Sequence, residues 1–170
     1  MSTSCLYGFK KNSELKLAYN HYDSYPSGWG KSIVLFIREN TLSELNEICD
    51  NIKLVDRKSL PNYNEIMEMI KKKIEYKCDG EILSWDDIFL HNYTIIEYYK
   101  KGFYIMPDYS KWIDGVNDYL YIINLDDNKF EVYEIDLLNK KVEKVYTYGK
   151  YKLLKEFDLE SIPRDWDKDI

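Results

Sequence analysis

The sequence has few cysteines and histidines, and these are too widely spaced to form a familiar metal or redox motif. Its 170 residues include 3 cysteines (Cys5, Cys49 and Cys78) and 2 histidines. No C-x-x-C pair is present, which excludes the spacing of zinc ribbons and of thioredoxin-type sites. We therefore expect three reduced thiols, no metal site and no cofactor.

The chain also lacks an excess of positive charge and any long apolar run. Lys and Arg total 24 against 30 Asp and Glu, so the formal net charge is −6. This balance argues against a protein whose main task is to grip the phosphates of nucleic acid. No stretch approaches the roughly 18 continuous apolar residues of a membrane span, and the first residues lack the pattern of a signal peptide. We expect a soluble cytoplasmic protein with no membrane or nucleic acid partner.

What the chain has in excess is tyrosine, with 17 residues. Apolar residues make up 45% of the sequence and charged residues 32%, a balance typical of globular proteins and not of disordered ones. The length suits a single domain over residues 1–170 with a core of its own. Residues 160–170 are polar, and we expect them to form a frayed tail.

Strand patterns occur at both ends of the chain. Residues 5–9 and 15–19 indicate a hairpin that turns at residues 11–13, because Leu15, Leu17 and Tyr19 alternate with Lys16 and Ala18. The C-terminal part predicts an antiparallel meander, since polar turn residues separate its strand-like runs. These runs are residues 119–125, 129–135, 142–148 and 151–157.

The middle of the chain has helical patterns. We expect a helix over residues 31–39 and a second one after Thr41, where Glu44 completes a capping box. A linker over residues 53–60 precedes a third start at Asn62, and Ser84 marks a fourth. Residues 93–99 suit a helix or a strand equally. The predicted fold is α+β, with an antiparallel sheet from the N-terminal hairpin and the C-terminal meander and a helical middle packed on one face.

The densest group of polar and aromatic residues is the segment Y-N-H-Y-D-S-Y-P-S-G-W-G, residues 19–30. Aromatic faces there can stack on a ring, while amide, imidazole and carboxylate groups can read its polar edges. A purely structural loop that closes the sheet edge is the alternative. The candidate ligand-binding residues are Tyr19, Asn20, His21, Asp23, Ser24, Tyr25, Trp29 and Lys31.

Catalytic motifs are missing from the same region. Gly30-Lys31-Ser32 imitates the end of a phosphate-binding loop, but Tyr25 stands where that motif needs a glycine. The G-x-S-x-G nucleophile elbow is also absent from the sequence. We name no catalytic residue, and a binding protein is favoured over an enzyme.

Two segments of the N-terminal region resemble an uncharacterised protein family of phages and prophages. They are C-L-Y-G-F-K-K-N, residues 5–12, and K-L-A-Y-N-H-Y-D-S-Y-P-S-G-W-G, residues 16–30, which carries the motif Y-N-H-x-D-S-Y-P-x-x-x-G. Residues 118–134 are similar to a later strand pair of that family. Trp29 stands where leucine is usual in the family. The resemblance implies a phage accessory protein that acts in the cytoplasm of the host cell.

Three functions are compatible with these observations. The first is a non-enzymatic binder of a small nucleotide-like ligand, a sponge that sequesters a signal of bacterial defence. The second is an inhibitor that docks on a host protein through exposed tyrosines. The third is a hydrolase resembling the N-terminal nucleophile enzymes, in which Cys5 would be the nucleophile. We favour the first, and homo-oligomer formation is left open.

Overall fold

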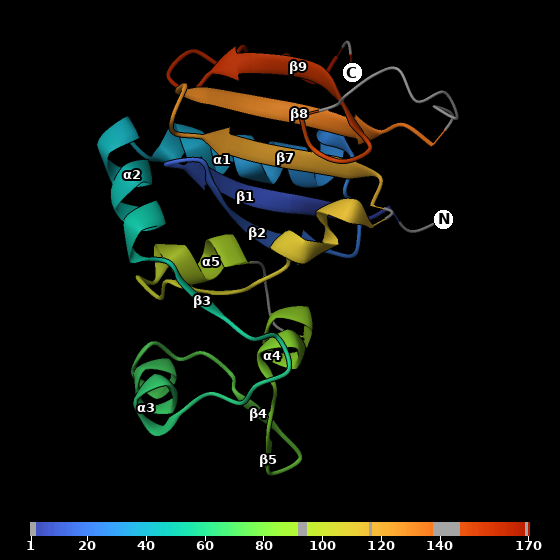
Figure 1. Ribbon diagram of the computed structural model, residues 1–170. Helices are drawn as coiled ribbons and strands as arrows, with labels where there is room; N and C mark the ends of the chain where they lie inside the picture. Colours follow the sequence, from blue (N-terminus) through green and yellow to red (C-terminus); the bar gives the residue numbers. More distant parts are fainter. Residues whose placement is uncertain (1–2, 92–94, 116, 138–146, 169) are drawn as a thin grey trace.

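The computed structural model describes residues 3–91, 95–115, 117–137, 147–168 and 170 (Figure 1). Within them a sheet of five strands has the order β2-β1-β7-β8-β9. All neighbours are antiparallel except β1 and β7, which run parallel and join the N-terminal hairpin to the C-terminal meander. The predicted α+β class is confirmed, although the sheet is not purely antiparallel. The strands are β1 (Cys5–Lys11), β2 (Glu14–Asn20), β7 (Tyr119–Asn124), β8 (Lys129–Ile135) and β9 (Tyr151–Asp158).

The predicted meander is confirmed at three of its four runs. The remaining run, residues 142–148, lies mostly outside the described residues. Its described end, Tyr148, forms an isolated bridge to Tyr151 at the start of β9.

The hairpin turns where the sequence predicts it. Asn12 and Ser13 have positive φ angles of 52° and 64°, which is the conformation that two-residue hairpin turns require. Their backbone N–H groups donate to the Asp126 carboxylate at 2.6 and 2.9 Å. Asp126 follows β7, so one side chain ties the β1–β2 turn to the neighbouring β7–β8 turn.

We expect the Asp126→Asn variant to melt at a lower temperature than the wild type near neutral pH, and this difference to disappear in acid. The N–H groups of Ser13 and Asn12 favour the charged carboxylate, so the pKa of Asp126 lies below its usual value. A carboxyl whose pKa is depressed by folding stabilises the fold above its unfolded pKa of about 3.9. That contribution is lost as the pH falls through the lower, folded pKa.

Thermal melts of both proteins between about pH 7 and about pH 2 test this expectation. Asp79→Asn, on the exposed turn between β4 (Lys77–Cys78) and β5 (Glu81–Ile82), is the matched control because it removes a carboxylate without touching the β1–β2 hairpin. A difference in melting temperature that stays constant over this pH range would contradict the assigned role of Asp126.

Local capping signals place the helices correctly. Thr41 with Glu44 and Asn62 with Glu65 each form a complete capping box, as the sequence predicts. The open choice at residues 93–99 is settled for residues 95–99, which are helical, while Tyr93 and Thr94 lie outside the described residues. The helices are α1 (Lys31–Glu39), α2 (Leu42–Asn51), α3 (Tyr63–Lys71), α4 (Trp85–His91) and α5 (Ile95–Lys100).

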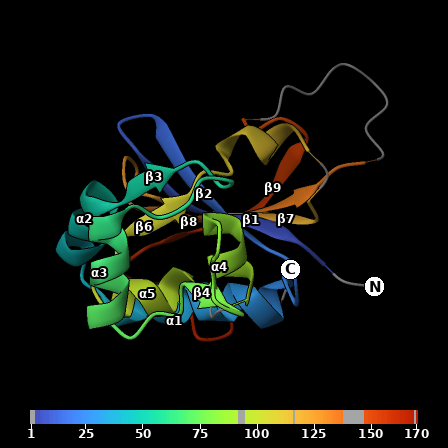
Figure 2. The same cartoon turned by 90° about the horizontal axis from the view of Figure 1, so that it is seen from below.

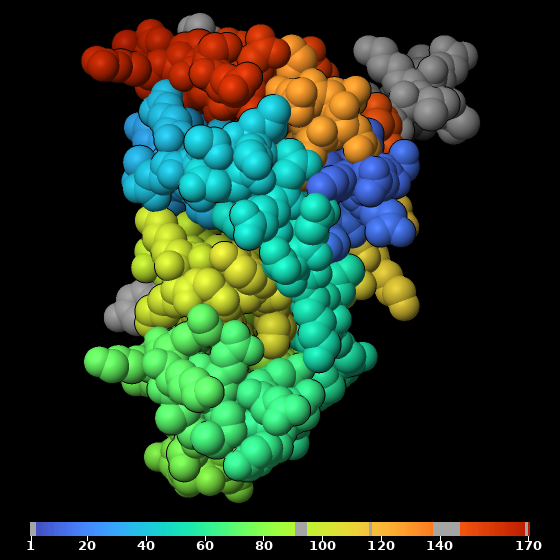
Figure 3. Space-filling model, turned by 90° about the vertical axis from the view of Figure 1, so that its left-hand side faces the viewer, coloured from blue at the N-terminus to red at the C-terminus, as the bar shows by residue number. Residues whose placement is uncertain are grey.

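The helices do not all cover the sheet. Buried residues of α1, α2 and α5 form one core with the sheet face that carries Tyr7, Phe9 and Tyr121, and Figure 1 shows α1 lying along that face. Residues of α3 and α4 instead pack around Trp85 and Phe103 in a separate cluster. Figure 3 shows this part of the chain, in green, at the opposite end of the molecule from β9, in red. The expectation of helices on one face therefore holds for three helices only.

The predicted linker over residues 53–60 contains a short strand, which corrects the sequence interpretation. β3 (Lys53–Val55) pairs in parallel with β6 (Ile105–Pro107). The hairpin β4 (Lys77–Cys78) and β5 (Glu81–Ile82) stands apart from both. The β3–β6 pair connects the α3–α4 region to the sheet, because Tyr109, just after β6, donates its N–H to Leu17 of β2 at 2.9 Å.

The other face of the sheet is covered by the short helix η2 (Ser110–Asp114) and the residues before it. Tyr109 and Ile113 pack there against Leu17 and Ile122. Figure 2 shows η2 and α1 on opposite sides of the sheet. Both faces are thus partly buried, by different parts of the chain.

The expectation of a frayed tail over residues 160–170 is wrong. Ile162 and Trp166 are only 9% and 3% exposed. They belong to the core between α1 and the sheet, which we call the α1-face core. Arg38 of α1 donates to the carbonyl oxygens of Ile162 and Pro163 at 3.1 and 2.7 Å. Two buried apolar side chains attach this segment to the core. The polar composition of the segment as a whole did not indicate them.

All three cysteines are free thiols, as predicted, with Cys5 and Cys49 buried and Cys78 exposed. Among the described residues, no helix has the length and apolar character needed to cross a membrane. The fold is thus held by packing and hydrogen bonds, without disulfides.

Candidate functional site

The candidate loop, residues 19–30, is divided between the two faces of the sheet. Tyr19 lies on the sheet face that η2 covers. Its ring stacks on that of Tyr109 and meets that of Trp112 edge-on, with centroid distances of 5.4 and 5.3 Å. Trp29 is buried in the α1-face core, with its ring centroid 5.2 Å from that of Tyr7. One pocket cannot therefore include both rings.

Several of the candidate residues hold the loop together. Ser24 is fully buried, its N–H donates to Thr3 Oγ1 at 2.9 Å, and its carbonyl accepts from the Tyr121 hydroxyl at 2.8 Å. The Asn20 side-chain amide donates to Ser24 Oγ at 2.9 Å. These contacts and the burial of Trp29 give Asn20, Ser24 and Trp29 structural roles.

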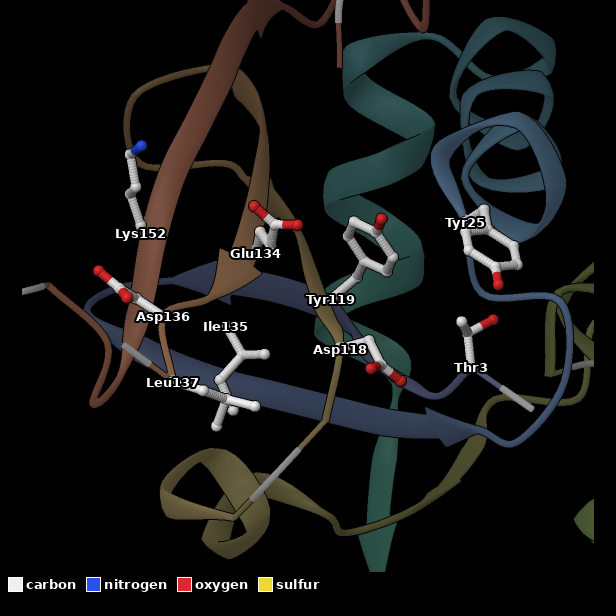
Figure 4. Close-up of a pocket in the computed structure, with 9 residues that line it drawn as sticks. All are labelled: Thr3, Tyr25, Asp118, Tyr119, Glu134, Ile135, Asp136, Leu137 and Lys152. Atoms are coloured by element: carbon white, nitrogen blue, oxygen red, sulfur yellow. The ribbon is translucent and has the colours of Figure 1, made fainter. Parts of the chain in front are cut away.

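The remaining candidates lie in different places, and all of them except the half-buried Tyr19 are exposed. The Tyr19 hydroxyl lies 2.8 Å from Nδ1 of the exposed His21. Asp23 has a positive φ of 50°, and its carbonyl accepts from the backbone N–H of Trp29 at 2.7 Å. Lys31 forms an ion pair with Asp167 at 3.1 Å. Tyr25 lies beside Tyr119 in a separate hollow (Figure 4).

Cys5 does not have the surroundings of a nucleophile. Its side chain is fully buried in β1, and burial raises the pKa of its thiol far above the usual value. The thiolate, which is the reactive form of cysteine, is therefore strongly disfavoured at neutral pH. This geometry argues against the hydrolase hypothesis in its Cys5 form.

A hollow of about 500 Å³ lies next to Tyr19, between the end of β3 and η2. We call it the Trp112 hollow. Its volume is in the range of sites that bind small molecules. Its lining residues are Leu54, Val55, Asp56, Arg57, Lys58, Asp108, Lys111 and Trp112.

The guanidinium group of Arg57 is held in a fixed position in this hollow. It lies 4.4 Å from the ring centroid of Trp112 and 4.8 Å from that of Tyr109, both within cation–π range. Its Nε lies 3.8 Å from the Asp86 carboxylate, which also accepts a hydrogen bond from the Tyr109 hydroxyl. Burial raises the pKa of Tyr109, so that its hydroxyl stays protonated and donates.

The lining of the hollow carries three basic and two acidic side chains. Arg57, Lys58 and Lys111 face two carboxylates, and both of these accept backbone hydrogen bonds. Asp56 accepts from the N–H of Lys58 at 2.8 Å, and Asp108 accepts from that of Ser110 at 2.9 Å. Because Arg57 already faces Asp86, the basic groups that an anionic ligand can approach most readily are Lys58 and Lys111.

This hollow was not predicted from the sequence, and the predicted site residue nearest to it, Tyr19, contacts the ring of Trp112. Arg57 and Lys58 lie in the segment interpreted as a linker, and Trp112 lies in a stretch without periodicity. No short motif joins these residues, because they meet only when β3 pairs with β6. No protein-family model, curated protein or solved structure matches this chain.

Proposed function

We propose that this protein binds a small nucleotide-like ligand in the Trp112 hollow without converting it. The observation that carries the proposal is the indole of Trp112, 40% exposed, in a hollow lined by Arg57, Lys58 and Lys111. A planar base can stack on an exposed indole, and phosphate oxygens pair with lysine and arginine. The two groups together favour a ligand that has both a ring and an anion.

The side chain of Arg57 is already held in place before a ligand binds. Because Tyr109, Trp112 and Asp86 already hold the guanidinium, little side-chain entropy is lost when a ligand binds next to it. The carboxylates of Asp56 and Asp108 accept backbone hydrogen bonds, which favours a structural role over acid or base catalysis. In the setting implied by the resemblance to phage proteins, such binding would sequester a nucleotide signal.

We expect AMP, ADP-ribose or a cyclic dinucleotide to bind in isothermal titration calorimetry, and Trp112→Ala to weaken the binding at least about fivefold. Loss of one base-stacking contact costs about 1–3 kcal/mol, and 1.4 kcal/mol corresponds to tenfold in affinity. Lys111→Glu is also expected to weaken binding, because it replaces attraction by repulsion. The difference in affinity from the wild type should grow as the salt concentration is lowered. Chromatography of the bound nucleotide should recover it unchanged.

Tyr63→Ala is the matched control, since Tyr63 is a 75% exposed aromatic side chain on α3, outside the hollow. The proposal fails if none of these nucleotides binds, or if Trp112→Ala and Tyr63→Ala bind them as the wild type does. Recovery of a cleaved nucleotide would replace the binding-only function with an enzymatic one.

A further inference from the structure

A second hollow, of about 470 Å³, lies at the end of the sheet where β7 begins and β8 ends (Figure 4). We call it the Tyr119 hollow. It shares no lining residue with the Trp112 hollow. Tyr25 is the one candidate ligand-binding residue among its described lining residues, which are Thr3, Tyr25, Asp118, Tyr119, Glu134, Ile135, Asp136, Leu137 and Lys152.

Strand register places three different side chains in one row across this hollow. Tyr119 of β7 pairs with Glu134 of β8, and Glu134 pairs with Lys152 of β9. Directly opposed residues of antiparallel strands project from the same face of a sheet. Figure 4 shows the Glu134 carboxylate beside the Tyr119 ring, with Lys152 farther along the row.

Two tyrosine rings from distant segments form one side of the hollow. Tyr25 enters from the loop before α1, and its ring centroid lies 6.2 Å from that of Tyr119, with 61° between the ring planes. Tyr25 is 43% exposed, so its ring is accessible to a ligand. Tyrosine rings attract cations placed over their faces.

The charges around the rings are mainly negative. Burial, followed by the nearby Glu134, Tyr25 and Asp118, raises the pKa of Tyr119. Asp118 accepts a hydrogen bond from the Ser4 N–H at 2.8 Å. Within the part of the chain that the structure describes, Glu134 forms no ion pair with a basic side chain within 4.0 Å.

We propose that the Tyr119 hollow binds an organic cation, with a substituted ammonium or guanidinium group placed against the tyrosine rings and the Glu134 carboxylate. The rings attract the charge and the apolar carbons next to it, and Glu134 accepts its hydrogen bonds. Simple metal ions do not fit this description, because their preferred ligands are several converging oxygens. The site is separate from the proposed nucleotide site, since the two hollows share no lining residue.

Titration calorimetry at low salt with spermidine and with the tripeptide Gly-Arg-Gly tests the proposal. We expect at least one of the two probes to bind. Glu134→Gln, which keeps the shape of the side chain, is expected to weaken binding about fivefold, and Tyr25→Ala about threefold to fivefold. Both residues are solvent-exposed in the fold, so the variants are expected to fold normally.

Glu47→Gln, an exposed carboxylate on α2, is the matched control and should leave the affinity unchanged. Binding of spermidine alone identifies a polyamine-like ligand, whereas binding of the peptide alone identifies a basic side chain of a partner. Absence of binding by both probes, or equal binding by the wild type, Glu134→Gln and Tyr25→Ala, would overturn the proposal. Neither result affects nucleotide binding at the Trp112 hollow.

Discussion

Replacing Trp166 with alanine is expected to lower the free energy of unfolding by about 3–5 kcal/mol, the usual cost of removing a buried tryptophan. Trp166 is 3% exposed, and its ring meets those of Phe130 and Phe157 edge-on at 5.5 and 6.0 Å. The ring also lies against Gly30, where an added Cβ would be 2.9 Å from it. Its loss would open a cavity between β8, β9 and the start of α1.

Urea denaturation of the wild type and Trp166→Ala measures this loss directly. Lys168→Ala is the control from the same segment, because Lys168 is exposed and forms a surface ion pair with Asp165. Such pairs contribute about 0–1 kcal/mol. If Trp166→Ala costs less than about 1 kcal/mol, the C-terminal segment does not anchor the core as the structure indicates.

The second large effect is expected at Gly8, in the middle of β1. A Cβ at this position would lie 1.9 Å from the carbonyl oxygen of Lys16 and 3.1 Å from the Cα of Leu17. These are backbone atoms of β2, and β1 is also bound to β7 on its other side. The clash cannot be relieved by a side-chain rotation, so Gly8→Ala is expected to destabilise the protein by about 3 kcal/mol or more.

Gly80→Ala separates this clash from a general effect of replacing glycine. Gly80 has a φ of +85° and open space around it, so alanine there costs only backbone strain, about 1–2 kcal/mol. Urea midpoints of the two variants provide the comparison. Equal destabilisation by both would show that the β1–β2 contact tolerates a side chain.

The sequence was most informative where structure depends on neighbouring residues. The capping boxes at Thr41 and Asn62 and the helix over residues 31–39 arise from contacts within a few residues. Backbone sterics and short-range hydrogen bonds determine such features, and a short window of sequence contains all the groups involved.

The candidate site was predicted less well, for a geometric reason. The segment of residues 19–30 passes the edge of the sheet, so Tyr19 and Trp29 pack on opposite faces although they are close in sequence. Functional side chains that are close together in the sequence can therefore lie far apart in the structure. Conversely, Arg57 and Trp112 meet although no local pattern connects them.

By itself, the sequence determined the α+β class, the positions of the caps and turns, and the acidic balance of the chain. The tertiary structure alone decided that β1 pairs in parallel with β7, that Trp166 anchors the C-terminal segment, and that two separate hollows form. These features depend on which distant apolar surfaces are buried together. Burial of apolar surface drives this pairing of distant segments, and no short segment contains both partners.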